Sequence, residues 1–296
     1  MPPPSYFKYV VLTTSSLAHL HPSGTPTFHS VNTDSSTNIS MIHPTAIIHP
    51  DATIGSNVSI GAFTIIDADV RIGDNCTIDP HVWISGQTTL GKKNFVGFGS
   101  HIGGNPQDTS FDKSTRSGVL IGDNNTIREH VTIHRSTSEG GLTTVGNNNM
   151  FMINSHLAHD VHVGDSNNLA NSVLIAGHIQ IGSFCFLGGG AGFHQFIQIG
   201  DYAICQGNAA ITKDIPPYCM AHGQNNLAGL NVIGLRRAGF NGEQRKEIKS
   251  AYNLLFKSDL SMTDALTQAD QRTWEAPTLL LINAAKNPSR KGIMMA

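Results

Sequence analysis

The sequence is poor in several of the residue types that hold an ordinary globular domain together. Only 14% of its 296 residues are charged and only 7% are aromatic, which is little for a conventional rounded core. The formal net charge of -2 argues against a broad electrostatic surface for nucleic acid. Apolar runs fall short of the roughly 18 residues that a membrane span needs. We therefore expect no nucleic-acid partner, no membrane span, and stabilisation by something other than a rounded core.

Cysteine is also scarce. The four cysteines, Cys76, Cys185, Cys205 and Cys219, lie far apart and form no CxxC pair. Scattered single thiols in a chain of this length favour packing residues in a reducing compartment over a disulfide framework. We therefore expect no disulfide scaffold.

What the sequence has instead is a six-residue repeat. Apolar residues recur at every sixth position from Ile42 to Ile102, and the step resumes at Ile121 and again from Val145 to Ile211. Glycine often follows the repeated residue. This period is neither helical nor a simple strand alternation, and a helix is disfavoured because Gly, Asn, Asp and Thr fill the intervals. The repeat is typical of a parallel β-helix, in which three hexapeptides close one triangular coil.

The predicted β-helix covers residues 41–218, and it accounts for a stable chain with few aromatics. Each inward aliphatic contributes on the order of 2 kcal/mol by burial. Two segments, 103–120 and 135–144, break the period and are predicted loops. Insertions in repeat proteins commonly lie on the binding face, although tolerated surface insertions are the alternative.

The two ends of the chain have a different character. After Pro216-Pro217, residues 243–257 place apolar side chains on one helical face, and Ser261 with Asp264 resembles a capping box. We predict a helical domain over residues 219–296. Residues 1–40 are rich in Ser and Thr and carry few charges. This arm resembles an organelle-targeting segment without the expected Arg, and a disordered tail or cloning remnant is the alternative.

Histidine is frequent, and several histidines lie close together in the sequence. If one coil takes 18 residues, His159, Gly177 and Gln195 fall in one column, and Asp160 and His178 fall in the next. Adjacent coils lie about 4.8 Å apart, so these residues line one ridge within roughly 10 Å. The other histidines of this stretch are His156, His162 and His194.

Three interpretations compete for this ridge. The histidines can be solvated surface residues, or a zinc site, although no cysteine or carboxylate completes a clear ligand set. We favour acid–base machinery, because neutral imidazole can take a proton from a hydroxyl as its oxygen attacks an acyl group. Asp160 can orient the His159 ring or stabilise its imidazolium. The Gly177 N–H can donate to the developing oxyanion.

Five segments carry a specific resemblance to a known family. They are IREHVTIHR at 127–135, MINSHLAHD at 152–160, LIAGH at 174–178, FHQF at 193–196 and DIPPY at 214–218. Together they resemble the UDP-N-acetylglucosamine O-acyltransferases of lipid A biosynthesis over about residues 41–260. The resemblance implies a homotrimer of left-handed β-helices with active sites between subunits. That handedness is an exception to the right-handed crossover rule.

The resemblance also implies a reaction and its residues. An (R)-3-hydroxyacyl group would pass from an acyl carrier protein thioester to the glucosamine 3-hydroxyl of UDP-N-acetylglucosamine, with no further cofactor and no metal. His159 matches the general base, Asp160 its partner and Gly177 the oxyanion donor. The positions that match substrate contacts are Gln107, Asp108, His156, His178, His194, Gln195, Asn231 and Arg237, and Gly207 matches the position that sets acyl length.

Two positions depart from the family pattern. Ser110 stands where relatives usually carry Lys, which leaves Lys113 as the nearest base, and Ile233 stands where Glu is frequent near the uridine. Two other functions stay open. The sibling UDP-3-O-acylglucosamine N-acyltransferase carries a folded domain before its repeats, for which residues 1–40 look too short and polar. A non-catalytic trimeric binding protein is the other. We expect a mitochondrial location if the arm is a transit peptide, and a cytoplasmic one otherwise.

Overall fold

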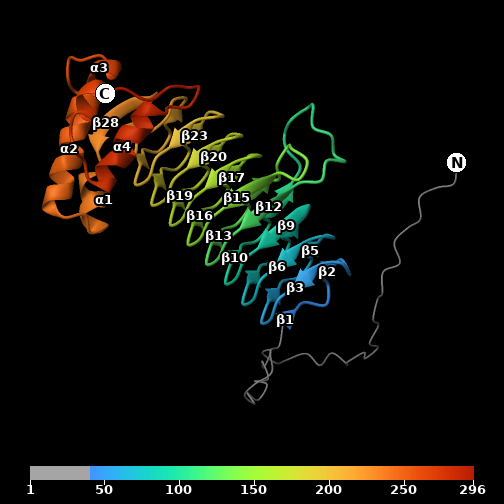
Figure 1. The fold of residues 1–296 in the computed structure, drawn as a ribbon. Helices are drawn as coiled ribbons and strands as arrows, with labels where there is room; N and C mark the ends of the chain where they lie inside the picture. The colour runs from blue at the N-terminus through green and yellow to red at the C-terminus, as the bar shows by residue number, and fades with distance from the viewer. Residues whose placement is uncertain (1–40) are drawn as a thin grey trace, which may run out of the picture. The chain divides into compact units, whose positions relative to one another are not determined.

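A computed structural model describes residues 41–296, which form a left-handed parallel β-helix followed by a hairpin and four helices (Figure 1). The predicted fold class is confirmed. The N-terminal arm, predicted as a targeting or disordered segment, lies outside the described residues. Within the part that the structure describes, no helix is long and apolar enough to cross a membrane.

The strands of the coil build three sheets, and each strand pairs in parallel with the equivalent strand of the next coil. Sheet A contains β1 (Met41–Ile42), β4 (Ser59–Ile60), β7 (Thr77–Ile78), β10 (Phe95–Val96), β13 (Thr126–Ile127), β16 (Met150–Phe151), β19 (Asn168–Leu169), β22 (Phe186–Leu187), β25 (Ile204–Cys205), β27 (Cys219–His222) and β28 (Asn226–Leu230). Sheet B contains β2 (Ile47–Ile48), β5 (Ile65–Ile66), β8 (Trp83–Ile84), β11 (His101–Gly104), β14 (Thr132–His134), β17 (His156–Leu157), β20 (Leu174–Ile175), β23 (Gly192–Phe193) and β26 (Ala210–Ile211). Sheet C contains β3 (Thr53–Ile54), β6 (Arg71–Ile72), β9 (Gln87–Leu90), β12 (Gly118–Ile121), β15 (Leu142–Val145), β18 (His162–Val163), β21 (Gln180–Ile181) and β24 (Gln198–Ile199).

The six-residue step produces this coil because most strands are only two residues long, with the second residue directed inward. Ile60, Ile127 and Leu169 occupy such positions and are buried in one continuous core. The corners need left-handed backbone, which short polar residues such as Asn57 and Asn75 adopt readily. Successive coils therefore stack in register, as in the pairing of Ser59 with Thr77.

A ladder of buried asparagines closes one inner corner of the coil. Asn94, Asn125, Asn149 and Asn167 are almost fully buried, and each side-chain amide donates to a main-chain carbonyl of the following coil. Each side-chain oxygen accepts from a main-chain N–H of the next coil. The buried polar groups are thus paired, as burial requires.

Both predicted loops leave the side of the coil next to β12 and β15 (Figure 1). They are shorter than the period alone indicates. Strand β11 continues to Gly104 and β12 begins at Gly118, so the first loop spans 105–117, and the second spans 135–141. The difference arises because β9, β12 and β15 pair over four residues here, which extends the ladder into the loop ends.

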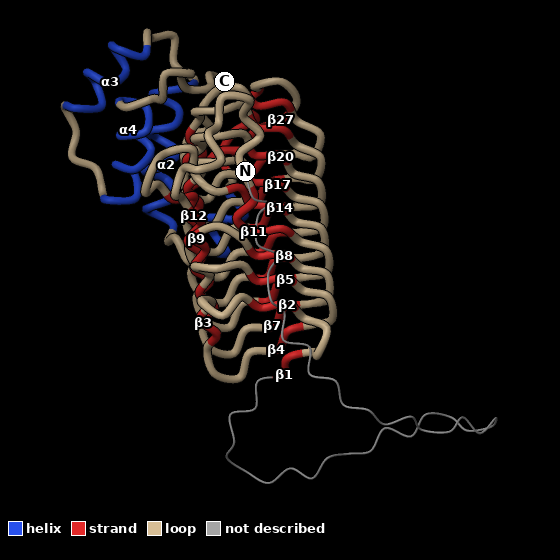
Figure 2. The backbone as a smooth tube through the Cα atoms, turned by 90° about the vertical axis from the view of Figure 1, so that its right-hand side faces the viewer, coloured by secondary structure: helices blue, strands red, loops and turns tan. Residues whose placement is uncertain are grey.

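The C-terminal part begins with strands rather than helices. β27 pairs in parallel with β25 and in antiparallel with β28, so this hairpin ends sheet A. The helices follow and gather at this end of the coil (Figure 2). The prediction of a helical domain over residues 219–296 is therefore wrong for residues 219–230, because the strands in this segment pair within sheet A. The helices are α1 (Val232–Arg237), α2 (Gly242–Phe256), α3 (Met262–Asp270) and α4 (Ala276–Lys286).

Candidate active site

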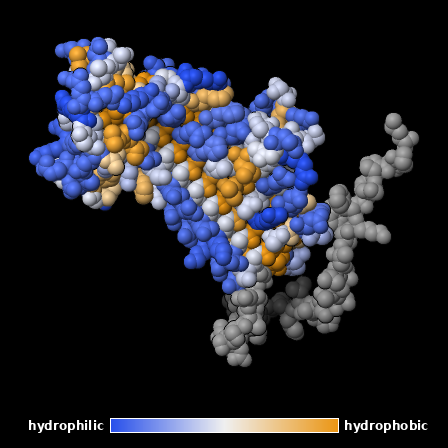
Figure 3. All heavy atoms as spheres, in the orientation of Figure 1, coloured by the Kyte–Doolittle hydropathy of each residue, from blue (hydrophilic) through white to orange (hydrophobic). Residues whose placement is uncertain are grey.

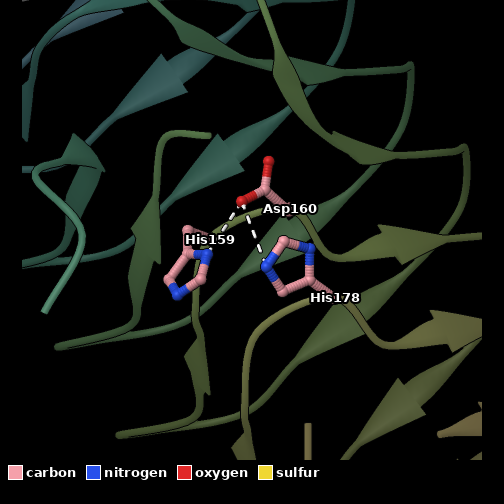
Figure 4. A group of neighbouring side chains, drawn as sticks. All are labelled: His159, Asp160 and His178. Carbon is pink, nitrogen blue, oxygen red and sulfur yellow. Dashed lines mark hydrogen bonds and ion pairs between the residues drawn. The ribbon is translucent and has the colours of Figure 1, made fainter. Parts of the chain in front are cut away.

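Two equivalent turns on adjacent coils build the candidate site. His159 and Asp160 follow β17, and Gly177 and His178 follow β20 one coil further on. Asp160 and His178 both have left-handed backbone, with φ of 59° and 61°. Figure 4 shows both imidazole rings beside the Asp160 carboxylate, with dashed lines to one of its oxygens. The column arithmetic from the sequence therefore corresponds to a real cluster.

The central pair is His159 and Asp160. His159 Nδ1 lies 2.8 Å from Asp160 Oδ2, and both side chains are largely buried, at 16% and 14% exposed. Since an ionised carboxylate only accepts hydrogen bonds, Nδ1 carries the proton. In the neutral imidazole, Nε2 then carries the lone pair that a general base needs.

Residues of the second loop hold the Asp160 carboxylate. Ser136 Oγ donates to Oδ1, while Thr137 donates to Oδ2 from its hydroxyl at 2.7 Å and from its main-chain N–H at 3.2 Å. Burial raises the pKa of Asp160, but the hydrogen bonds from His159, Ser136 and Thr137 outweigh it and hold that pKa far below its usual value. Asp160 therefore stays ionised and keeps the His159 ring oriented.

Gly177 lies directly against the His159 ring. A Cβ at position 177 would be 2.6 Å from His159 Cε1 and 2.9 Å from Nε2, so only glycine permits this approach. Within residues 41–296, no protein acceptor takes the Gly177 main-chain N–H. The His159 ring therefore packs against a glycine whose main-chain N–H has no acceptor in the described chain.

Two further histidines border this pair. His178 Nε2 lies 3.8 Å from Asp160 Oδ2, and its ring meets His159 edge-on with centroids 5.0 Å apart. Burial lowers the pKa of His178 despite the opposing effect of Asp160. His156 Nδ1 lies 2.7 Å from Thr132 Oγ1, and burial together with the charge of His159 lowers the pKa of His156. Both imidazoles are therefore biased toward the neutral form.

A groove of about 690 Å³ opens beside the cluster. His156, His159 and Gln107 are among its polar lining residues, whereas most of its wall is apolar. Such a surface suits a ligand with a polar head and a hydrocarbon chain. The lining residues are Gln107, His156, Ala158, His159, Leu174, Ile175, Ala176, Gly177, Gly192, Phe193, His194, Ala210, Ile211 and Thr212.

The same three side chains have the residue types of a metal site. One ligand atom each from His159, Asp160 and His178 lies within 4.8 Å of the others. Asp160 thus supplies the carboxylate that we considered missing from the sequence. Both of its oxygens already accept hydrogen bonds, however, and His159 Nδ1 is held by one of them. The Asp160 carboxylate therefore orients the His159 ring.

The first loop brings Gln107 to the groove, and Asp108 follows it on the loop surface. Asp108 Oδ1 accepts from the Ser110 hydroxyl and main-chain N–H at 2.7 and 2.8 Å, and these bonds lower the pKa of Asp108. Ser110 therefore holds Asp108 in place. Lys113 lines a separate hollow of about 380 Å³ beside Trp83.

The structure does not bring Asn231, Arg237 or Gly207 to the groove of the described chain. Asn231 is buried at the start of α1, where its side chain accepts from Gly234 N–H and donates to Tyr202 O. Arg237 and Ile233 lie exposed on α1, and Gly207 lies exposed between β25 and β26. His194 borders the groove, and Gln195 lies exposed beside it.

Three contributors were not apparent from the sequence. Ser136 and Thr137 hold the Asp160 carboxylate, and Thr143 Oγ1 accepts the Asp160 main-chain N–H at 2.8 Å. The six-residue step fails across the second loop, so no column arithmetic connects Ser136 and Thr137 to Asp160. Their only sequence signal is their place directly after the segment IREHVTIHR.

A left-handed β-helix with a paired histidine and aspartate beside a mostly apolar groove is typical of a hexapeptide-repeat acyltransferase. Comparison with known proteins identifies the family. A family model described as UDP N-acetylglucosamine O-acyltransferase, domain 2, matches residues 214–294. An acyl-[acyl-carrier-protein]–UDP-N-acetylglucosamine O-acyltransferase of Campylobacter concisus is 36% identical over 78% of this chain and 89% of its own length.

Solved structures agree with this result. The UDP-N-acetylglucosamine acyltransferase of Bacteroides fragilis superposes with a TM-score of 0.81 at 40% identity, over 86% of this chain and 99% of its own. That of Arabidopsis superposes with a TM-score of 0.74 at 32% identity, over 82% and 95%. The chain belongs to the UDP-N-acetylglucosamine O-acyltransferase family, and the family predicted from the sequence is confirmed.

Proposed function

We propose that this protein transfers an (R)-3-hydroxyacyl group from acyl carrier protein to the 3-hydroxyl of UDP-N-acetylglucosamine, the first step of lipid A assembly. The names of its relatives supply the donor and acceptor classes. The observation that carries the chemistry is the His159–Asp160 pair, whose imidazole packs against Gly177 in a mostly apolar groove. The thioester itself activates the acyl group, so the proposal includes no cofactor and no metal.

In the proposed reaction, His159 Nε2 takes the proton of the sugar hydroxyl as its oxygen attacks the thioester carbonyl. Asp160 stabilises the imidazolium through Nδ1–H, and the Gly177 N–H donates to the tetrahedral oxyanion. The C–S bond then breaks, and the leaving thiolate takes the proton back from His159. The products are an ester and the free thiol of the carrier protein, so protons and electrons balance.

We assign substrate contacts to the other predicted residues that line the groove or lie next to its lining residues. Gln107 and Asp108 on the first loop, with His156 and His178, would hold the sugar near the base. His194 and Gln195 follow β23 and would contact the acyl chain beside Phe193. Support for the acyl assignment is the apolar wall that His194 borders.

We further propose a homotrimer, because Asn231, Arg237 and Gly207 lie away from the groove of their own chain. In a trimer they can contribute to the groove of a neighbouring subunit, the first two toward the nucleotide and Gly207 at the far end of the acyl chain. Sheet B leaves Ile47, Ile65 and Leu174 exposed at 48%, 37% and 53%. Several exposed aliphatic side chains on one face are typical of a surface that binds another protein. Figure 3 shows apolar side chains gathered on the coil between hydrophilic borders.

The location depends on the arm. We propose a mitochondrial location if residues 1–40 act as a transit peptide, and a cytoplasmic one otherwise. The similarity to an Arabidopsis protein makes a eukaryotic host compatible with the family. Fusing residues 1–40 to a fluorescent protein tests this directly, since a diffuse signal would exclude import.

The deciding assay offers a panel of 3-hydroxyacyl carrier proteins to UDP-N-acetylglucosamine and identifies products by mass spectrometry. We expect a 3-O-acyl product, and we expect His159→Ala to abolish its formation. Acylation of an amino sugar alone would support the sibling N-acyltransferase. Carrier-protein binding without turnover, or turnover that survives His159→Ala, would overturn the proposed mechanism and favour a binding protein.

A further inference from the structure

The last residues of the chain return to the final coils of the β-helix. Asp214 is buried beside this tail, and its carboxylate accepts from the Ser289 main-chain N–H and hydroxyl, both at 2.6 Å. The Asp214 main-chain N–H donates to Gly292 O, and Met294 N–H donates to Asp214 O. Because Met294 is also fully buried, the tail is anchored on both sides of Arg290.

Arg290 begins a stack that ends at the active site. Its guanidinium carbon lies 3.4 Å from the centroid of the Phe196 ring. The other partner of Phe196 is His178, stacked in parallel with centroids 4.6 Å apart and planes 5° apart. His178 Nε2 then lies 3.8 Å from Asp160 Oδ2. Tail, aromatic ring, imidazole and catalytic carboxylate therefore form one continuous series of contacts.

The backbone makes this stack possible. Asp160, His178 and Phe196 occupy the same corner of three successive coils, each with left-handed φ, the last at 70°. A bulky residue such as Phe is disfavoured in this conformation. Here the corner directs the ring between His178 and Arg290, so the unfavourable backbone is offset by two aromatic contacts.

We propose that Arg290 is a positioning residue for acyl transfer: through Phe196 it holds the His178 ring in place beside Asp160, so the C-terminal tail is part of the active site. This inference rests on the proposed function, in which the Asp160 carboxylate must orient the His159 ring and stabilise its imidazolium. A fixed His178 ring stays 3.8 Å from Asp160 Oδ2 and does not displace the His159 Nδ1–H from that oxygen.

The charge of Arg290 also affects His178, because it lowers the pKa of that imidazole. Burial lowers the pKa of His178, Asp160 raises it, and His159, Arg290 and His162 lower it. Loss of the Arg290 charge therefore raises the pKa of His178. A protonated His178 would compete with His159 for the Asp160 carboxylate, and the loss of activity would be largest at low pH.

The test uses full-length protein with Arg290→Gln, its conservative partner Arg290→Lys, and the control Lys291→Gln. The control removes the same charge from the neighbouring position, and Lys291 donates only through its main chain. Histidine ring titrations are followed by NMR, with His178→Gln used for assignment, and kcat/KM is measured from pH 6 to 8.

We expect Arg290→Gln to raise the His178 titration midpoint and to lower kcat/KM at pH 6, relative to pH 8, by about 3- to 10-fold more than in wild type. Arg290→Lys should largely restore both, and Lys291→Gln should change neither. An unchanged His178 titration with an unchanged pH profile would overturn the proposal. A lower melting temperature of Arg290→Gln with a wild-type pH profile of kcat/KM would also overturn the proposal, because it would indicate a purely structural role. The titration needs no turnover, so it tests the contact of Arg290 with His178 through Phe196 separately from the proposed reaction.

Discussion

Replacing Gly177 by alanine tests the arrangement around His159 directly. The new Cβ would lie 2.6 Å from His159 Cε1 and 2.9 Å from Nε2, whereas carbon atoms in contact lie about 3.5–4.0 Å apart. The three atoms nearest this Cβ all belong to the imidazole, and the backbone at 177 is not left-handed, so the ring must retreat by about 1 Å. A displacement of that size costs about 10²-fold in rate, which corresponds to about 2.7 kcal/mol of transition-state stabilisation.

The assay compares kcat and melting temperature with those of Gly164→Ala. At position 164 a Cβ would lie 2.6 Å from Ser183 Oγ and 2.7 Å from Gly182 O, an equally tight place on the coil away from the groove. We expect Gly164→Ala to lower the melting temperature but to keep kcat per folded molecule. We expect Gly177→Ala to lower kcat but to keep the melting temperature. Wild-type kcat in Gly177→Ala would refute the placement of His159 against this glycine.

Three other substitutions address the carboxylate, the first loop and the inner ladder. Asp160→Asn should lower kcat by about 10²–10⁴-fold, because the His159 ring loses its oriented acceptor. Because hydrogen bonds depress the pKa of Asp160, its stabilising effect is present above about pH 3.9 and is lost as pH falls toward the folded-state pKa. The difference in unfolding free energy between wild type and Asp160→Asn should therefore shrink in acid, as denaturant titrations at pH 7 and pH 3 can show. Arg135→Met should raise the acceptor KM by about 10-fold or more, because the buried guanidinium donates to Asn105, Ser117 and main-chain oxygens of the loop that carries Gln107; an unchanged KM, with loop proteolysis as wild type, would contradict this. Asn149→Ala should cost about 1–3 kcal/mol in denaturant unfolding without affecting KM, since it leaves the Gly164 carbonyl and the buried Asn167 N–H without their side-chain partner.

The sequence by itself determined the coil and the core of the site. In a β-helix, residues 18 apart lie on adjacent coils, so a constant step converts position in the sequence into position in space. The proximity of Gly177 to His159, and of His178 to Asp160, could therefore be predicted, and the structure brings both pairs together. The C-terminal helices could also be predicted, because their apolar spacing and the Ser261 cap are local signals.

Only the tertiary structure decided the contacts that cross an irregular segment. Ser136 and Thr137 reach Asp160 from a loop that has no period, and Arg290 reaches Phe196 from a tail that returns after four helices. The hairpin at 219–230 depends on pairing with the last strand of sheet A rather than on its own pattern. Such contacts form where the folded chain pairs the buried polar groups of each segment and packs its apolar side chains. They could not be predicted from the sequence, because no fixed spacing along the chain relates the residues that meet.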